Sequence, residues 1–146
     1  MAYIDGAGNT LTAAGEPQEI ALQPAPALTG GGAATDYPCV AVPSGRFKTV
    51  ALVVTTPITW TSAGQVTAQL YAGRTAASAS DANHPLRGAP VNVGPSGTTL
   101  LAGTYLLTQQ DIADLQSYLP CVGVRLVFPS APTAGAASVY VDVAGD

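Results

Sequence analysis

The chain has 146 residues, of which nine are acidic, five are basic and one is His, so that its formal net charge is −4. Charged residues make up 10% of the chain, whereas an average soluble domain is about one-quarter charged. The five basic residues are scattered and form no stripe interleaved with aromatic side chains, which argues against a nucleic-acid partner. The length fits a single domain, residues 1–146, and the scarcity of charge favours a surface that another protein covers.

The first third of the chain, residues 1–45, predicts an extended arm and a loop-rich region. Residues 7–14 predict an extended polar arm, and residues 18–23 predict a short strand with Ile20 and Leu22 on one face. Residues 24–32 contain two Pro and three consecutive Gly, which predicts a loop. The Gly run lacks the following Lys-Ser/Thr of a phosphate-binding loop, so we interpret it as a turn.

From Phe47 onward the hydrophobic pattern has a period of two, which is typical of half-buried β-strands. Residues 47–56 and 65–71 predict two strands, and residues 57–64 between them predict a hairpin loop with Trp60 at or near its tip. Two further alternating strands close the chain. The pattern predicts one core between two sheets, formed by Val50, Leu52, Val54, Val66, Leu70, Val124, Leu126, Val139 and Val141.

The remaining segments complete the predicted fold. Short strands are expected at residues 90–93 and 98–101, around a turn at residues 94–97. One short helix is expected over about Thr108–Leu119, because Thr108 and Asp111 form a capping pattern and Pro120 ends it. Seven or eight short strands with Gly/Pro turns predict an all-β antiparallel β-sandwich or jelly roll with one helix and an extended N-terminal arm.

Residues that could carry out catalysis are few. His84 lies beside Pro85 with Asp81 three residues earlier, and we expect it in a loop, exposed to solvent. Asp111 and Asp114 lie at the start of the expected helix, where carboxylates stabilise the helix dipole. No zinc, calcium or dinucleotide motif is present. The sequence therefore predicts no catalytic, cofactor or metal site, and a protein that is not an enzyme.

The two cysteines, Cys39 and Cys121, are too far apart in sequence to form a C-x-x-C pair. The first residues show neither the basic nor the apolar region of a secretory signal, and the longest apolar run, residues 50–54, is far shorter than the roughly 20 residues that cross a bilayer. We expect a protein made in the cytoplasm, without membrane contact, whose thiols are reduced and buried. A disulfide is the alternative.

The aromatic residues are the candidates for a protein interface, because interface cores favour Tyr and Trp. Tyr71 and Tyr140 fall on the polar faces of their predicted strands. The alternatives are that the rings pack at strand edges and cover the core, or that they stack on sugars. The candidate interface residues are Trp60, Tyr71, Tyr140, Tyr3 and Tyr37.

A family resemblance rests on an order of segments between Thr49 and Val143. A Val/Leu-rich strand precedes a strand of the form x-V-T-x-x-L, a Ser/Ala-rich loop, a Leu-Pro segment leading into V-R-L, a Pro/Thr/Ala/Gly loop and a last alternating strand. The matching residues are 50–54, 66–70, 78–81, 119–120, 124–126, 133–135 and 139–143, with 3–5, 11–12 and 19–22 near the start. This order resembles the small capsid cement proteins, or decoration proteins, of tailed bacteriophages.

The resemblance implies a jelly-roll-like domain that forms homo-oligomers, a dimer rather than a trimer, and binds the major capsid protein on the outside of the virion. Its implied role is structural: such a protein stabilises contacts between capsid subunits. Two alternatives come from other classes. One is a phage tail or fibre domain that binds a receptor or a carbohydrate, and the other is a small lytic domain, against which the lack of a catalytic set argues.

Overall fold

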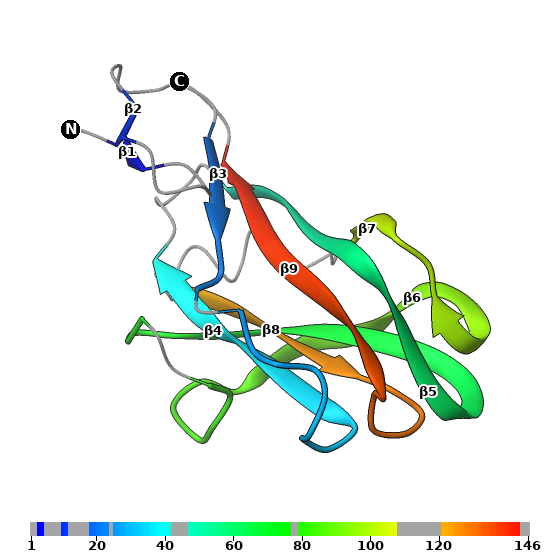
Figure 1. The fold of residues 1–146 in the computed structure, drawn as a ribbon. Helices are drawn as coiled ribbons and strands as arrows, with labels where there is room; N and C mark the ends of the chain where they lie inside the picture. Colours follow the sequence, from blue (N-terminus) through cyan, green and yellow to red (C-terminus); the bar gives the residue numbers. More distant parts are fainter. Residues whose placement is uncertain are drawn as a thin grey trace.

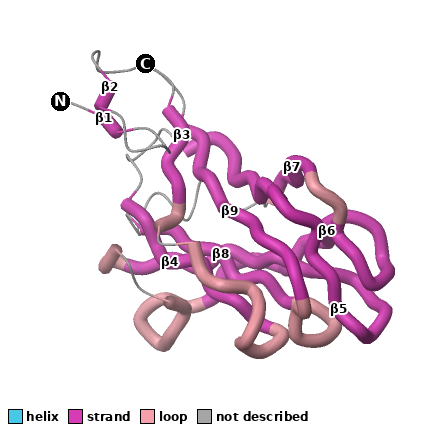
Figure 2. Tube along the Cα trace, viewed as in Figure 1, coloured by secondary structure: helices cyan, strands magenta, loops and turns pink. Residues whose placement is uncertain are grey.

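The computed structural model describes residues 3–4, 10–11, 18–23, 25–41, 47–76, 79–107 and 121–143. Every regular element among them is a strand (Figure 2). The helix expected over residues 108–119 lies outside the described residues, as does most of the expected polar arm at residues 7–14. None of the described residues form a helix long and apolar enough to cross a membrane.

All strand pairs are antiparallel. A two-stranded sheet and a seven-stranded sheet account for them, and the larger sheet curls into a nearly closed, barrel-like shape (Figure 1). An all-β antiparallel fold was predicted from the alternating pattern and is confirmed. The strands are β1 (Tyr3–Ile4), β2 (Thr10–Leu11), β3 (Gln18–Ala21), β4 (Ala34–Ala41), β5 (Phe47–Gly73), β6 (Leu86–Leu100), β7 (Gly103–Leu106), β8 (Cys121–Val127) and β9 (Ala134–Val143).

Strand β5 organises the molecule because its 27 residues take part in both layers. Its first half pairs with β9 on one side and β7 on the other, and its second half pairs with β8 and β6. In Figure 1 it runs beside β9, turns at the lower right, and continues below as the green strand. The large sheet therefore folds over itself into a β3–β9–β5–β7 layer and a β4–β8–β5–β6 layer.

The turn of β5 corrects the prediction of a hairpin loop at residues 57–64. These residues stay within the strand, and the two halves of β5 pair with other strands instead of with each other. Ile58 and Trp60 point into the core at this turn, at 0% and 4% exposure. Glycine permits the close packing around them, because a Cβ on Gly135 (φ +120°) would lie 2.5 Å from Cα of Ile58.

The core fills the space between the two layers. All nine core residues predicted from the alternating pattern belong to one buried cluster. Residues near the turn of β5 extend that cluster, where the rings of Trp60 and Phe128 lie 5.6 Å apart between centroids. Leu22, Leu28, Leu100 and Leu107 join it from loops and strand ends.

The segment predicted as an arm contributes two strands to the large sheet. Strand β3 pairs with β9, and β4 pairs with β8 through a register shift between Tyr37 and Val40. Because of this shift, Tyr37 faces the core, whereas Cys39 belongs to a separate cluster on the outer face. The Tyr37 hydroxyl donates to the carbonyl of Ala137 at 2.9 Å, which links the β4 edge of one layer to β9 of the other.

Candidate functional site

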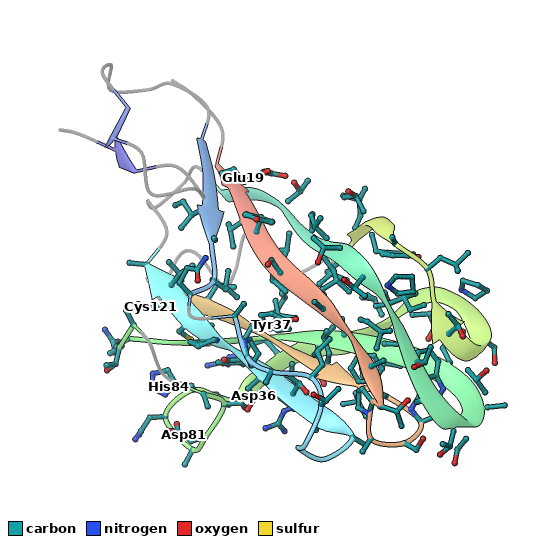
Figure 3. All side chains as sticks on the ribbon, viewed as in Figure 1. Glu19, Asp36, Tyr37, Asp81, His84 and Cys121 are labelled. Carbon is teal, nitrogen blue, oxygen red and sulfur yellow. The ribbon has the colours of Figure 1, made fainter. Side chains whose placement is uncertain are left out.

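The outer face of the β4–β8–β5–β6 layer carries most of the ionisable side chains that the structure brings together. A loop, of which residues 74–76 and 79–85 are described, folds back onto this face; we call these residues the covering loop. Asp36 on β4 accepts hydrogen bonds from Nε and Nη2 of Arg125 on β8 at 2.7 and 2.9 Å, and from the Ser80 amide of the covering loop at 3.2 Å. One carboxylate thus joins two strands and the loop. Asp36, Asp81 and His84 lie toward the bottom of the molecule in Figure 3.

His84 closes the covering loop onto the sheet and is 5% exposed, although the sequence predicted a solvated position. Its Nδ1 lies 2.9 Å from Oδ1 of Asp81, and its ring lies on Gly73, where any Cβ would clash with it. The hydrogen bonds of Asp81 to His84 and Asn83 hold the pKa of this exposed carboxyl below its usual value. The missed signal is Gly73 itself, since a Gly at the end of a strand marks a close approach.

Tyr71 and the two thiols form a second buried cluster, separate from the main core. Tyr71 is fully buried, its ring lies on Gly123, and its hydroxyl donates to the carbonyl of Tyr37. Cys39 and Cys121 are free and buried in the same cluster. Burial first, and then the nearby Cys121 and Asp81, raise the pKa of Cys39 to about 12, and burial raises the pKa of Cys121.

The hydrogen bonds of Asp36 and of His84 hold the covering loop against the sheet. Thiols with raised pKa values are protonated and therefore poor nucleophiles. Among the described residues, no group of three or more His, Cys, Asp or Glu is placed to hold a metal ion. Nε2 of His84 is buried without a hydrogen-bond partner, and a hollow of about 320 Å³ beside it is lined by Arg74, Thr75, Asn83 and His84. We assign this region a structural role.

Where β5 turns, the described residues carry no charged side chain. Residues 49–73, 88–107 and 126–141 contain no Asp, Glu, Lys, Arg or His. Strand pairing brings these three stretches together where β5 turns, at the right of Figure 1. We call residues 55–66, 93–107 and 128–137 the uncharged corner. Its exposed positions are Thr, Ser, Ala, Gly, Pro and Leu residues, so it presents a surface that is weakly hydrated compared with a charged one.

Hydroxyl groups fasten the uncharged corner without ion pairs. The amide of Thr133 donates to the carbonyl of Thr59 at 2.8 Å, and their hydroxyls lie 3.1 Å apart. The Ser130 hydroxyl accepts from the amides of Thr61 and Ser62 at 3.2 and 3.1 Å. The loop between β8 and β9 is therefore held against the turn of β5, and the corner is a pre-formed surface.

Strand β7 forms an open edge of this corner. Among the described strands it pairs with β5 alone, so one side of its backbone has no strand beside it. Leu101 and Leu106 are two-thirds exposed, at 66% and 67%. The Tyr105 hydroxyl donates to the carbonyl of Leu101 at 2.7 Å and braces the connection from β6 to β7. Two large apolar side chains on an uncharged edge indicate a site for a protein partner.

The candidate interface residues predicted from sequence fall in different places. Trp60, Tyr37 and Tyr71 are buried within this chain, which corrects the expectation that they face a partner. The side chain of Tyr3 lies outside the described residues. Tyr140 is half-buried on the outer face of β9, in a cross-strand row with Ala21, Ala51 and Leu106. Sequence reasoning missed the two exposed leucines, because only the edge position of β7 distinguishes them from core leucines.

Comparison of the chain with protein-family models, with curated proteins and with solved structures finds no match in any of the three. The evidence for a partner-binding site at the uncharged corner therefore comes from the geometry of this chain alone.

Proposed function

We propose that this protein is a structural virion protein, a cement or decoration protein that binds the outside of a phage capsid and stabilises contacts between major capsid subunits. The observation that carries this proposal is the uncharged corner. It is a pre-formed surface with two exposed leucines, built where β5 turns and held by hydrogen bonds that use no charged group. Such a surface suits burial against another protein.

The proposed role is mechanical and uses no catalysis. A shell filled with DNA is under outward load, and a protein that bridges neighbouring subunits adds buried surface across their seams. A curled antiparallel sheet with jelly-roll character provides a stiff body for this task. The net charge of −4 favours the exterior of the virion, away from the phosphates inside, and gives no reason to expect nucleic acid or membrane as a partner.

Shells that lack the protein provide the test. Purified protein is added to them, and occupancy and the temperature at which the particles release DNA are measured. We expect high occupancy, a higher release temperature, and weak dependence on salt, because few ion pairs are available to be screened. Ser62→Glu places a charge in the exposed part of the corner, and Ala82→Glu places the same charge in the covering loop. The first change should reduce occupancy and the second should leave it unchanged.

Failure to occupy the shells, or occupancy without a gain in particle stability, overturns the proposal. Binding to whole host cells or to isolated tails in the same series would then favour the alternative of a tail or fibre domain that binds a receptor or a carbohydrate.

A further inference from the structure

We infer that the β7 edge is where two copies of this chain join, each β7 lying antiparallel beside the β7 of the other copy. The inference deepens the proposed assembly role, on which it rests, by naming the edge and its occupant. It starts from the open side of β7, whose backbone groups have no neighbouring strand among the described residues. A strand from another chain satisfies such groups directly.

Strand β7 is short, at four residues, but its sequence lacks the charges and the proline that protect many open strands. Natural sheets protect exposed edges with Lys, inward charges or Pro on the strand. Gly103, Thr104, Tyr105 and Leu106 include none of these, and residues 88–107 contain no charge. Leu101 and Leu106 instead add exposed apolar area at both ends of the strand.

The distribution of charge favours a second copy as the occupant. Two chains that each carry a net charge of −4 repel one another, and contact through the edge free of charge keeps their charged ends apart. Glu19 lies on β3, at the opposite edge of the layer from β7, and Asp142 lies on β9, which β5 separates from β7. An isologous contact also presents two identical neutral edges, which need no matching of charges.

The contact extends from the edge to the adjoining face. Leu106 ends the row that runs through Ala51, Tyr140 and Ala21 across the outer face of the β3–β9–β5–β7 layer. Thr104 is exposed on the same face as Leu106, two residues away. A partner strand beside β7 would continue this face into a larger sheet and cover part of the Leu106 side chain.

The first test is the mass of the protein in solution by sedimentation velocity, over a wide range of concentration. We expect the full chain to sediment at about twice its 14.6 kDa mass. Leu106→Glu should raise the dissociation constant of the dimer about tenfold or more, because it removes apolar burial and adds charge at the contact. Val127→Glu adds the same charge at a residue that is 39% exposed on the other layer and should leave the dimer intact.

Chemical cross-linking tests the same contact with a substitution that adds no charge to the edge. Thr104→Cys places an exposed thiol on the edge, whereas the native thiols are buried. A short bismaleimide should cross-link this variant into covalent dimers in high yield. Leu101→Glu provides a second edge variant should Leu106→Glu fail to fold.

A monomeric wild-type protein overturns the inference. A dimer that stays intact in both Leu106→Glu and Leu101→Glu also overturns it, as does a failure of the bismaleimide to cross-link Thr104→Cys. Shell binding by a monomeric wild-type protein would leave the proposed function standing without this dimer. A dimer through β7 that does not bind shells would support this inference and overturn the proposed function.

Discussion

The covering-loop region and the uncharged corner differ in the groups that form their hydrogen bonds. At the loop, Asp36 is hydrogen-bonded to Arg125 and to the Ser80 amide, and Nδ1 of His84 is hydrogen-bonded to Asp81. At the corner, the fastening groups are hydroxyls and backbone amides, and the outer surface is left bare of charge. The ionisable groups are thus hydrogen-bonded within the chain, whereas the described surface of the corner is neutral.

The two regions also differ in how well their residues fit a functional site. The presence of His, Cys, Asp and Tyr together draws attention to the covering loop, but their burial and raised thiol pKa values argue against reactivity. The corner has no reactive group, yet it exposes Leu101 and Leu106 on an open edge. The exposed leucines and the lack of charge at the corner therefore support the proposed interface more strongly than the reactive residue types near the covering loop support a catalytic site.

The largest expected effect concerns thiol reactivity. The pKa of about 12 for Cys39 lowers its thiolate fraction at neutral pH roughly thousandfold relative to an ordinary thiol. We expect native protein to react with a disulfide reagent far more slowly than Thr104→Cys does at its added thiol. Denatured under non-reducing conditions, the wild-type chain should titrate two thiols. A count of zero would reveal a disulfide, and fast native reaction would mean that the covering loop opens.

Next comes the core that both regions share. Leu126→Ala should lower the free energy of unfolding by about 2–5 kcal/mol, because the buried side chain leaves a cavity. Val127, its neighbour, is partly exposed on the opposite face, so Val127→Ala is the matched control and should cost little. Urea denaturation of both variants measures the difference. Equal costs would show that the register of β8 is wrong.

A smaller effect is expected where the loop meets the sheet. Gly73→Ala should cost about 1–3 kcal/mol, because the added Cβ would clash with the His84 ring. Gly31→Ala is the control, since nothing lies within 4 Å of the atom it would add. Hydrogen exchange in residues 79–85 should quicken in the first variant alone. If the two substitutions prove equally harmless, His84 does not rest on Gly73.

The smallest effect is the pH dependence that Asp81 contributes. Its pKa is lowered in the folded state by the hydrogen bonds from His84 and Asn83. The resulting stabilisation is present above the unfolded-state pKa of about 3.9 and is lost as the pH falls through the lower folded-state value. Asp81→Asn should therefore melt slightly below wild type at neutral pH, and the gap should close at acidic pH. A gap that widens on acidification would contradict this assignment.

The period-two pattern predicted the core well because burial of one strand face leaves a direct trace in sequence. The alternating pattern alone was enough to predict that Val50, Leu126 and Val141 lie in the core. The pattern does not tell whether the other face is open to solvent. Tyr71 lies on the polar side of its strand and is nevertheless buried, because it packs with Cys39 and Cys121 in a second cluster and its ring lies on Gly123.

The turn of β5 was missed for a related reason. Pro57 and Gly64 are ordinary signals of a loop, yet here they lie in a strand that bends sharply while keeping partners on both sides. What supports the bend is distant in sequence: Ser130, Thr133 and Gly135 hold it from the β8–β9 segment. Strand β4 was missed because Pro38 and a register shift interrupt its alternation.

The sharing of β5 between the two layers has a consequence for how the chain folds. Neither layer can assemble fully without the strand that also completes the other, so unfolding should be a single cooperative transition. The strand must also find β9, more than eighty residues downstream at the pairing of Val50 with Val141, before its first half is held in place. Folding dominated by such distant pairings is slow, on the order of milliseconds to seconds.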